Sequence, residues 1–332
     1  MRGNVFIFVF ILAVLNIFFW QAFHFHETNK KYLDQIDSRL NNTNDSTPWQ
    51  GCNPTQIPTT GKEAELIQYG YKLVTNTAYY LGPNGTVKNN NNALTCQSCH
   101  LEAGTKPFGN NFGKVAATYP VFRDRNNGTQ TIMMRLDDCF QRSMNGQTLD
   151  SNTREMQAIK AYITWVGSDC RKNEKKPGTS LTTLPFLNRA ADPAKGKPLY
   201  FTHCSSCHGK AGEGQYNAAE KRFVYPPLWG TNSWNDGAGM YRIRTLSSFI
   251  YYNMPQGTTY GNPRMSKEDS WDIAAYILSK PRPHFDQSKD FLNLRKKPID
   301  DAIGPYLDNY TSRQHKYGPF APIQQFYQNI KN

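Results

Sequence analysis

"CQSCH" at residues 96–100 and "CSSCH" at residues 204–208 both follow the pattern C-x-x-C-H. Two thiols one turn apart can form thioethers to the vinyl groups of a porphyrin, and the adjacent histidine then lies beneath the iron as its proximal ligand. A zinc site would need further Cys and His pairs at ligand spacing, which the sequence does not offer. Covalent haem c is therefore expected twice. The expected haem residues are Cys96, Cys99 and His100 in the first motif and Cys204, Cys207 and His208 in the second.

The sequence around each motif repeats one plan. In the first half, residues 61–82 predict an opening helix and residues 151–167 a closing helix. In the second half, residues 192–203 predict a short helix that runs into the motif, and residues 266–280 a closing helix with Ser266 as its N-cap. This order predicts a mainly α protein with two tandem class I cytochrome c-like domains, each with one covalent haem c.

Changes in composition along the chain suggest the domain boundaries. A stretch rich in Asn, Thr and Pro precedes the first domain, a charged and then Pro/Ser/Thr-rich stretch separates the two, and a Pro- and aromatic-rich stretch follows. The predicted organisation is an N-terminal transmembrane anchor or signal segment (1–26), a tether (27–60), cytochrome c domain 1 (61–170), a linker (171–190), cytochrome c domain 2 (191–285) and a C-terminal arm (286–332).

The apolar run at residues 5–23 decides how the N-terminus is interpreted. It approaches the roughly 20 residues that a membrane helix needs and exceeds the about 7–15 of a signal-peptide core, and no small-x-small cleavage site follows it. We favour an uncleaved membrane anchor, with a cleaved signal as the alternative. Because haem c is attached outside the cytoplasm, we expect a periplasmic protein tethered to the inner membrane, or a soluble periplasmic one after cleavage.

The charge and composition of the 332 residues limit the possible partners. The net charge of +12 is spread along the chain without a nucleic-acid motif, so we expect no nucleic-acid partner. An anionic substrate or partner fits this charge better, and a generally cationic surface without a specific partner is the alternative. A hydrophobic content of 38% is lean for two cores, and two haems would supply apolar interior.

The second haem has three candidate distal ligands: Met240, Met254 and Met265. "YYNMPQG" at residues 251–257 favours Met254, because a methionine before a proline in a loop suits the distal side of a cytochrome c domain. A thioether ligand raises the haem potential, which indicates an electron-transfer site.

The distal side of the first haem is different. The candidate methionines, Met133, Met134 and Met144, flank "RLDDCFQRS" at residues 135–143. A helix over residues 128–146 would place Arg135, Cys139 and Ser143 at i, i+4 and i+8, with Arg142 three residues after the cysteine as a second cation on that face. Guanidinium groups favour a thiolate, so Cys139 could ligate iron or attack sulfur. A buried inert cysteine, half of a disulfide, and an incidental thiol on a solvated basic face are the alternatives.

Counting cysteines narrows these alternatives. Of seven, four lie in the haem motifs, and Cys52 and Cys170 flank the first domain, so a possible disulfide between them would leave Cys139 as the odd thiol. Upstream, "YPVFRDR" at residues 119–125 adds Arg123 and Arg125, and arginine presents planar donor forks that suit oxyanions. The sequence thus predicts an anion site at a redox metal.

Together these motifs resemble the dihaem thiosulfate dehydrogenase / tetrathionate reductase family over roughly residues 50–325. The resemblance implies His/Cys ligation of the first haem by His100 and Cys139, and His/Met ligation of the second by His208 and Met254. Some family members carry a lysine before the distal methionine and exchange it with the methionine. This chain has Asn253, so methionine is expected in both redox states. The residues expected to act in catalysis are Cys139, Arg125, Arg135 and Ser143.

The implied reaction couples two thiosulfates to tetrathionate with release of two electrons, or runs in reverse. Our hypothesis is that the Cys139 thiolate forms a cysteine S-thiosulfonate, and that electrons pass through the second haem to an external cytochrome c or a quinol-linked carrier. The alternatives are a non-catalytic dihaem electron carrier, a cytochrome of the sulfur-oxidising complexes, and a dihaem peroxidase.

Overall fold

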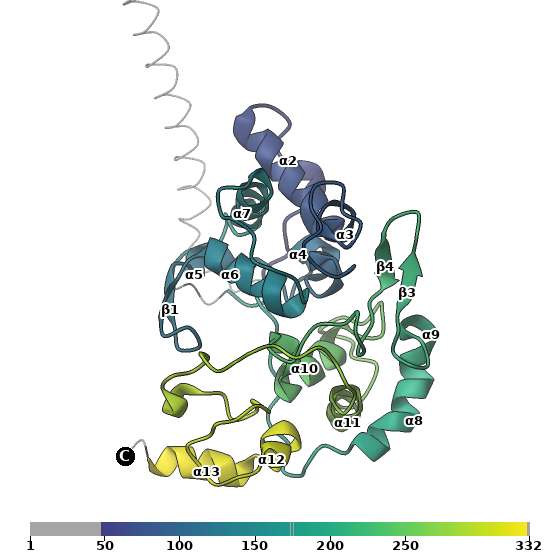
Figure 1. The fold of residues 1–332 in the computed structure, drawn as a ribbon, viewed down its shortest axis with the longest axis vertical. Helices are drawn as coiled ribbons and strands as arrows, with labels where there is room; N and C mark the ends of the chain where they lie inside the picture. Colours follow the sequence, from purple (N-terminus) through teal and green to yellow (C-terminus); the bar gives the residue numbers. More distant parts are fainter. Residues whose placement is uncertain (1–47, 173, 175, 331–332) are drawn as a thin grey trace, which may run out of the picture. The chain divides into compact units, whose positions relative to one another are not determined.

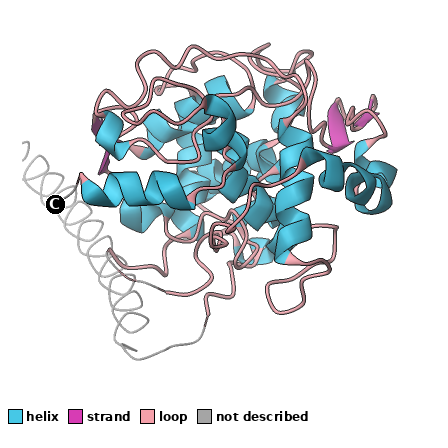
Figure 2. Cartoon of the chain, turned by 90° about the horizontal axis from the view of Figure 1, so that it is seen from below, coloured by secondary structure: helices cyan, strands magenta, loops and turns pink. Residues whose placement is uncertain are grey.

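Helices dominate the computed structural model, which describes residues 48–172, 174 and 176–330 (Figures 1 and 2). These residues belong to one compact unit. The predicted anchor or signal segment 1–26 and most of the tether lie outside them. Within the described residues, no helix is long and apolar enough to cross a membrane.

The first half begins with a short 3-10 turn and contains the first haem motif and Cys139. Its elements are η1 (Pro54–Gln56), α2 (Lys62–Thr75), α3 (Thr77–Leu81), η2 (Cys96–Ser98), α4 (Leu101–Gly104), α5 (Val115–Thr118), β1 (Val121–Arg123), β2 (Gly128–Gln130), α6 (Ile132–Asp138), the π-helix η3 (Cys139–Ser143) and α7 (Arg154–Val166). The predicted opening helix is split at Asn76 between α2 and α3. The closing helix α7 is confirmed, with Thr153 as N-cap and Gly167 after its end.

The second half repeats the helical plan. Its elements are α8 (Pro193–His203), α9 (Ser205–His208), β3 (Gln215–Asn217), β4 (Arg222–Tyr225), η4 (Gly239–Tyr241), α10 (Ile243–Asn253) and α11 (Lys267–Leu278). Ser266 accepts a hydrogen bond from Asp269 N at 2.9 Å, which confirms it as the N-cap of α11. The predicted linker 171–190 contains no helix or strand where it is described.

Both halves use the same helix crossing. In Figure 1, α2 lies beside α7 and α8 beside α11, so an opening helix packs on a closing helix in each half. A glycine stands at each crossing: a Cβ on Gly70 would overlap the backbone carbonyl of Ala158, and one on Gly196 that of Asp272. This close approach of backbones is possible only where the side chain is absent.

The strands form two short antiparallel hairpins (Figure 2). In the first, Phe122 pairs with Thr129 and positions the segment that holds Arg125. In the second, Phe223 of β4 pairs with Tyr216 and also belongs to the buried core of the first half. The amide of Phe223 donates to Ala93 O at 3.3 Å, just before the first haem motif. A strand of the second half therefore packs against the core of the first half.

The C-terminal arm carries three helical segments that the sequence did not predict: η5 (Leu294–Lys296), α12 (Ser312–Tyr317) and α13 (Ala321–Asn329). Tyr317, Phe320, Ile323 and Tyr327 join the buried core of the second half. Earlier in the arm, the amide of Phe291 donates to Arg125 O at 2.9 Å. The arm thus contacts both halves.

The crossing of α8 and α11 yields a stability prediction. Replacing Gly196 by alanine forces the two backbones apart, and overpacking of this kind costs about 1–3 kcal/mol. We expect a lower urea midpoint for the haem-loaded variant in a denaturation monitored by circular dichroism. The control is Gly261→Ala, because a Cβ there meets no atom within 4 Å. Equal midpoints for the two variants would refute the tight crossing.

Candidate functional site

Cys139 begins a single π-helical turn rather than continuing a regular helix. The sequence predicted one helix through residues 128–146, but the structure has β2, then α6 capped by Thr131, and then η3. Met144 N donates to Cys139 O at 3.0 Å, five residues back, which is the hydrogen-bond spacing of a π-helix. The predicted i, i+4, i+8 stripe is therefore wrong in detail, because a π turn changes the angle between successive side chains. Such turns occur often at functional sites.

The first C-x-x-C-H motif is preorganised by its neighbours. Thr77 Oγ1 accepts from Cys96 N at 3.0 Å, and Thr95 and Ser98 form a capping box around η2. His100 Nδ1 lies 2.5 Å from Asn110 O, so we assign the ring proton to Nδ1. Nε2 then carries a free electron pair that can bind a metal. Burial lowers the pKa of His100 to about 4. The imidazole is therefore neutral at pH 7, as a metal ligand must be.

Cys139 lies close enough to both attachment cysteines to act on them electrostatically. Burial raises the pKa of Cys96 to about 11 and that of Cys99 to about 12, and the charge of a Cys139 thiolate contributes to both shifts. The two half-buried thiols, a neutral imidazole with Nε2 free, and the thiol of Cys139 form a donor set that fits a covalently attached haem. Cys96 and Cys99 would attach the haem, and His100 and Cys139 would supply donors to its iron.

The second motif has a matching arrangement. His208 Nδ1 lies 2.8 Å from Pro226 O, and burial lowers the pKa of the ring. Met254 follows the last residue of α10 and packs on the core of the second half, as Met265 also does. Met240 is buried in the same core. The donors present fit a second haem c, and Met254 as its distal ligand stays a prediction.

Arg142 is not available to a substrate. Its Nη1 and Nη2 donate to the two carboxylate oxygens of Asp290 at 2.7 and 2.8 Å, and its guanidinium lies 4.3 Å from the centre of the Phe285 ring. The side chain is buried. The expectation that Arg142 adds a cation to the Cys139 face is therefore wrong, because a carboxylate from the C-terminal arm neutralises it.

Arg135 and Arg125 remain as cations of the site. The charge of a Cys139 thiolate raises the pKa of Arg135, whose nearest carboxylate, Asp138, is 4.0 Å away. Arg125 Nε lies 3.8 Å from Asp290. Burial lowers the pKa of Arg125 to about 10, and the charges of Arg142, Arg242 and Arg135 add to this effect. Arg125 is therefore still protonated at pH 7, within a cluster of like charges.

Arg242, at the N-terminus of α10, is the cation that sequence reasoning missed. Its Nε is buried without a hydrogen-bond partner among the described residues. The positive charge of Arg242 helps to lower the pKa of Arg125. Burial raises the pKa of Asp301, and the charge of Arg242 opposes this effect. The residue lies 100 positions after Arg142 in sequence, so no local pattern could have assigned it to this site.

The remaining residues singled out in the sequence are two near the site, Ser143 and Arg123, and the two cysteines that flank the first domain. Ser143 closes the π turn and is half-buried, whereas Arg123 is exposed. The thiol of Cys52 donates to Val166 O at 3.1 Å, and that of Cys170 lies 3.7 Å from Asp169 Oδ1. The possible disulfide between Cys52 and Cys170 stays a prediction.

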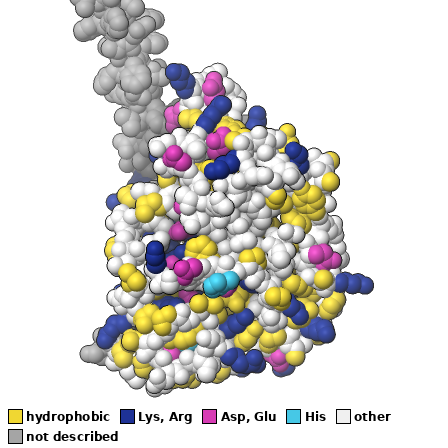
Figure 3. Space-filling view, in the orientation of Figure 1, with side chains coloured by type: hydrophobic (Ala, Val, Ile, Leu, Met, Phe, Trp, Pro, Cys, Tyr) yellow, Lys and Arg dark blue, Asp and Glu magenta, His cyan; other side chains and the backbone are white. Residues whose placement is uncertain are grey.

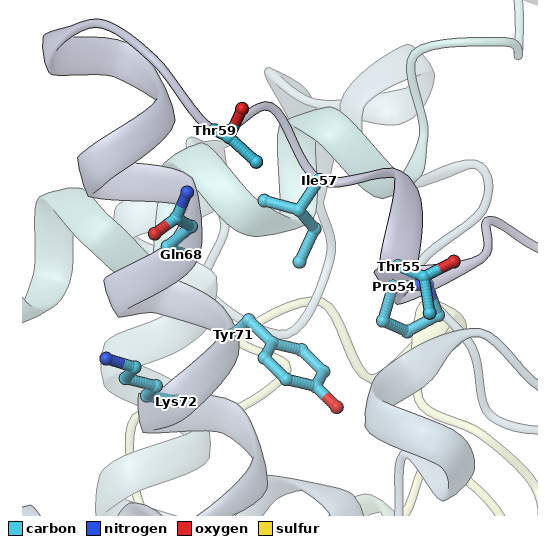
Figure 4. Close-up of a pocket in the computed structure, with 7 residues that line it drawn as sticks. All are labelled: Pro54, Thr55, Ile57, Thr59, Gln68, Tyr71 and Lys72. Atoms are coloured by element: carbon cyan, nitrogen blue, oxygen red, sulfur yellow. The ribbon is translucent and has the colours of Figure 1, made fainter.

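The surface charge and a cavity near the start of the described chain lie outside the Cys139 site. Figure 3 shows Lys and Arg side chains scattered over the visible face, in keeping with a diffuse net charge of +12. A cavity of about 340 Å³ lies between η1 and α2 (Figure 4). None of its lining residues belongs to the Cys139 site. They are Pro54, Thr55, Ile57, Thr59, Gln68, Tyr71 and Lys72.

Each half of the chain matches a known family of cytochrome c domains. Residues 86–171 match the SoxA/TsdA cytochrome c domain, and residues 193–281 match the cytochrome c family. The thiosulfate dehydrogenase of Stutzerimonas stutzeri (strain A1501) is 35% identical over 223 residues, which are 66% of this chain and 68% of that protein. The thiosulfate dehydrogenase of Allochromatium vinosum is 35% identical over 200 residues, which are 59% of this chain and 72% of that protein.

A solved structure is similar as well. The thiosulfate dehydrogenase (TsdBA) from Marichromatium purpuratum superposes with a TM-score of 0.65 at 30% identity. The match covers 71% of this chain and half of that longer chain. The likeness thus spans most of this chain in fold as well as in sequence.

The Arg142–Asp290 pair yields a second prediction. Asp290→Ala removes the carboxylate that pairs with both Nη atoms of the buried Arg142 and leaves only Asp138, 3.7 Å from Arg142 Nε. Removing one partner of a buried ion pair typically costs about 3–5 kcal/mol. We expect a marked loss of urea stability in the haem-loaded protein. Asp286→Ala, four residues earlier and exposed, is the matched control and should change stability by about 0.5 kcal/mol or less. If the Asp290 variant is no less stable than this control, the pair does not stabilise the turn.

Proposed function

Because the chain belongs to the thiosulfate dehydrogenase family of dihaem c-type cytochromes, we propose that it interconverts two thiosulfate ions and one tetrathionate ion, with two electrons released or taken up. One observation carries the proposal. Cys139, on a π turn beside the first haem motif, lies in a cluster of arginines that its domain and its neighbour supply together.

The haem groups, when bound, would each accept or donate one electron, so two of them match a two-electron reaction. The chain's residues that would hold them are Cys96, Cys99, His100 and Cys139 for the first, and Cys204, Cys207, His208 and Met254 for the second. Asn253 precedes Met254 and is buried, which supports methionine as the ligand in both redox states.

The Cys139 thiolate would act as the sulfur nucleophile. In the direction of reduction it attacks the central S–S bond of tetrathionate, one thiosulfate dianion leaves, and the product is a cysteine S-thiosulfonate, Cys–S–S–SO₃⁻. Two electrons then break the new S–S bond and release the second thiosulfate with return of the thiolate. Oxidation runs through the same steps in reverse. Arg135 lies close enough to Cys139 for a thiolate charge there to raise the pKa of Arg135.

The arginines would bind the dianions. Two thiosulfates carry four negative charges that repel one another strongly where water is excluded. Arg125, Arg135 and Arg242 supply three positive charges, and a planar guanidinium fork can donate two hydrogen bonds to a pair of sulfonate oxygens. Ser143 closes the same turn and would donate its hydroxyl to one of these oxygens. Charge neutralisation and orientation together lower the barrier to S–S bond formation.

We also propose that the protein works outside the cytoplasm, because haem c is attached there. Residues 1–26 would anchor it to the inner membrane, with a cleaved signal as the alternative. The electrons would pass through the second haem to an external cytochrome c or a quinol-linked carrier.

Removing the nucleophile tests the proposed reaction. Cys139→Met keeps a sulfur side chain able to bind iron but has no thiolate, so tetrathionate reduction and thiosulfate oxidation should both fall by at least ~10³-fold. The assay is steady-state turnover of the haem-loaded protein in both directions with one electron carrier. Cys170→Ser is the control, a half-buried cysteine outside the haem motifs. Turnover of the Cys139 variant near the wild-type rate would rule out the proposed chemistry.

Removing Arg242 tests the role of the second domain in anion binding. Arg242→Gln deletes one charge from the site, and because a charge-assisted contact contributes about 1.5–3 kcal/mol, KM for tetrathionate should rise roughly 10- to 100-fold. The KM of the variant should also depend less on ionic strength. Arg313→Gln makes the same charge change at an exposed position of α12. The role is contradicted if KM shifts no more in Arg242→Gln than in this control.

A further inference from the structure

A segment of the second domain is bound into the turn that carries Cys139. Asn235 is 1% exposed, and its side-chain Nδ2 donates to Gln141 O at 2.8 Å. Its backbone N donates to Arg142 O at 3.2 Å. The same Nδ2 lies 3.0 Å from Asn145 Oδ1. One buried asparagine thus contacts Gln141 and Arg142 within the Cys139 turn and Asn145 just after it.

These contacts satisfy the end of the π turn. The last carbonyls of any helix lack partners within it, and a buried carbonyl left without a partner is costly. Within the turn, Cys139 O accepts from Met144 N and Phe140 O accepts from Gly146 N at 2.8 Å. The next two carbonyls, those of Gln141 and Arg142, accept from Asn235. The asparagine therefore completes the turn from outside the first domain.

An asparagine of the first domain, Asn92, also contacts the segment that carries Asn235. Asn92, four residues before the first haem motif, donates its Nδ2 to Ser233 O at 3.2 Å. The amide of Asn92 donates to Met144 O at 3.0 Å. The segment that carries Asn235 is thereby fixed against both the haem motif and the end of the Cys139 turn. Asn235 Oδ1 also accepts from Gly237 N at 3.2 Å, which keeps its amide group oriented.

We propose that Asn235 of the second cytochrome c domain is a positioning residue that holds the Cys139 turn in the geometry needed for a thiolate ligand and nucleophile at the first haem. The inference rests on the proposed role of Cys139. The electron-transfer domain would then do more than relay electrons, because it completes the catalytic turn of its neighbour.

The test is Asn235→Asp in the haem-loaded, oxidised protein. Aspartate has the same size and keeps the oxygen that accepts from Gly237 N, but at neutral pH it cannot donate to Gln141 O and it places a negative charge against that carbonyl. The first readout is the electron paramagnetic resonance signal of low-spin, thiolate-ligated haem. The second is the near-infrared band of methionine-ligated ferric haem, which reports on the second haem alone.

We expect the ratio of thiolate-ligated to displaced first haem to fall about tenfold or more, equivalent to ~1.4 kcal/mol. The methionine band should be unchanged, and kcat should fall with the ligated fraction while KM stays near the wild-type value. Asn232→Asp is the matched control, because the Asn232 side chain is exposed three residues earlier in the same segment. Its ligation ratio should equal that of the wild type. If the aspartate variant does not accumulate with haem, Asn235→Ala tests the same prediction without an added charge.

Two results would overturn the inference. One is a wild-type ligation ratio in both Asn235 variants, or an equal loss in the Asn232 control, either of which would show that the amide does not position Cys139. The other is a wild-type protein without any thiolate signature, which would also remove the assigned role of Cys139. The first result leaves the proposed reaction intact and the second does not, so the two failures can be told apart.

Discussion

The paired hydrogen bonds between Arg142 and Asp290 connect the Cys139 turn to the C-terminal arm, and the charge balance of the site depends on them. Asp290 is the carboxylate that binds both Nη atoms of this buried guanidinium, and losing one partner of a buried pair is strongly unfavourable, so the arm must lie where Asp290 can reach the turn. With Arg142 neutralised, the remaining cations are left for an anion. The same carboxylate lies 3.8 Å from Arg125, which places that second guanidinium beside the first. One acidic residue of the arm thus helps to arrange two of the four arginines.

The arginines around Cys139 repel one another, and a bound dianion would reduce this repulsion. Burial lowers the pKa of Arg125 to about 10, and the like charges of Arg142, Arg242 and Arg135 add to this effect. A thiolate at Cys139 relieves part of this repulsion, as the raised pKa of Arg135 indicates. A thiosulfate or tetrathionate dianion would relieve more. A thiolate at Cys139 and a bound dianion would therefore interact with the same group of cations.

The sequence predicted what is encoded locally, and the structure added what comes from distant residues. The C-x-x-C-H motifs, the N-cap Ser266 and the closing helix α7 are each recognisable within a few residues. The structure confirms the N-cap and the helix, and each motif lies within a matched cytochrome c domain. The π turn at Cys139 was not predictable, because two of its carbonyls, those of Gln141 and Arg142, accept hydrogen bonds from Asn235 of the other domain. The neutralisation of Arg142 and the contribution of Arg242 depend in the same way on contacts about 100 to 150 residues apart in sequence.

The central claim is that the Cys139 sulfur forms a covalent bond to substrate sulfur. The most direct measurement is mass spectrometry of the haem-loaded protein after incubation with tetrathionate without reductant, followed by acid quenching, which slows thiolate exchange. The account predicts that the peptide containing Cys139 gains the mass of one S₂O₃ group, while the peptide containing Cys170 does not. An unmodified Cys139 peptide in a preparation that turns tetrathionate over would contradict it.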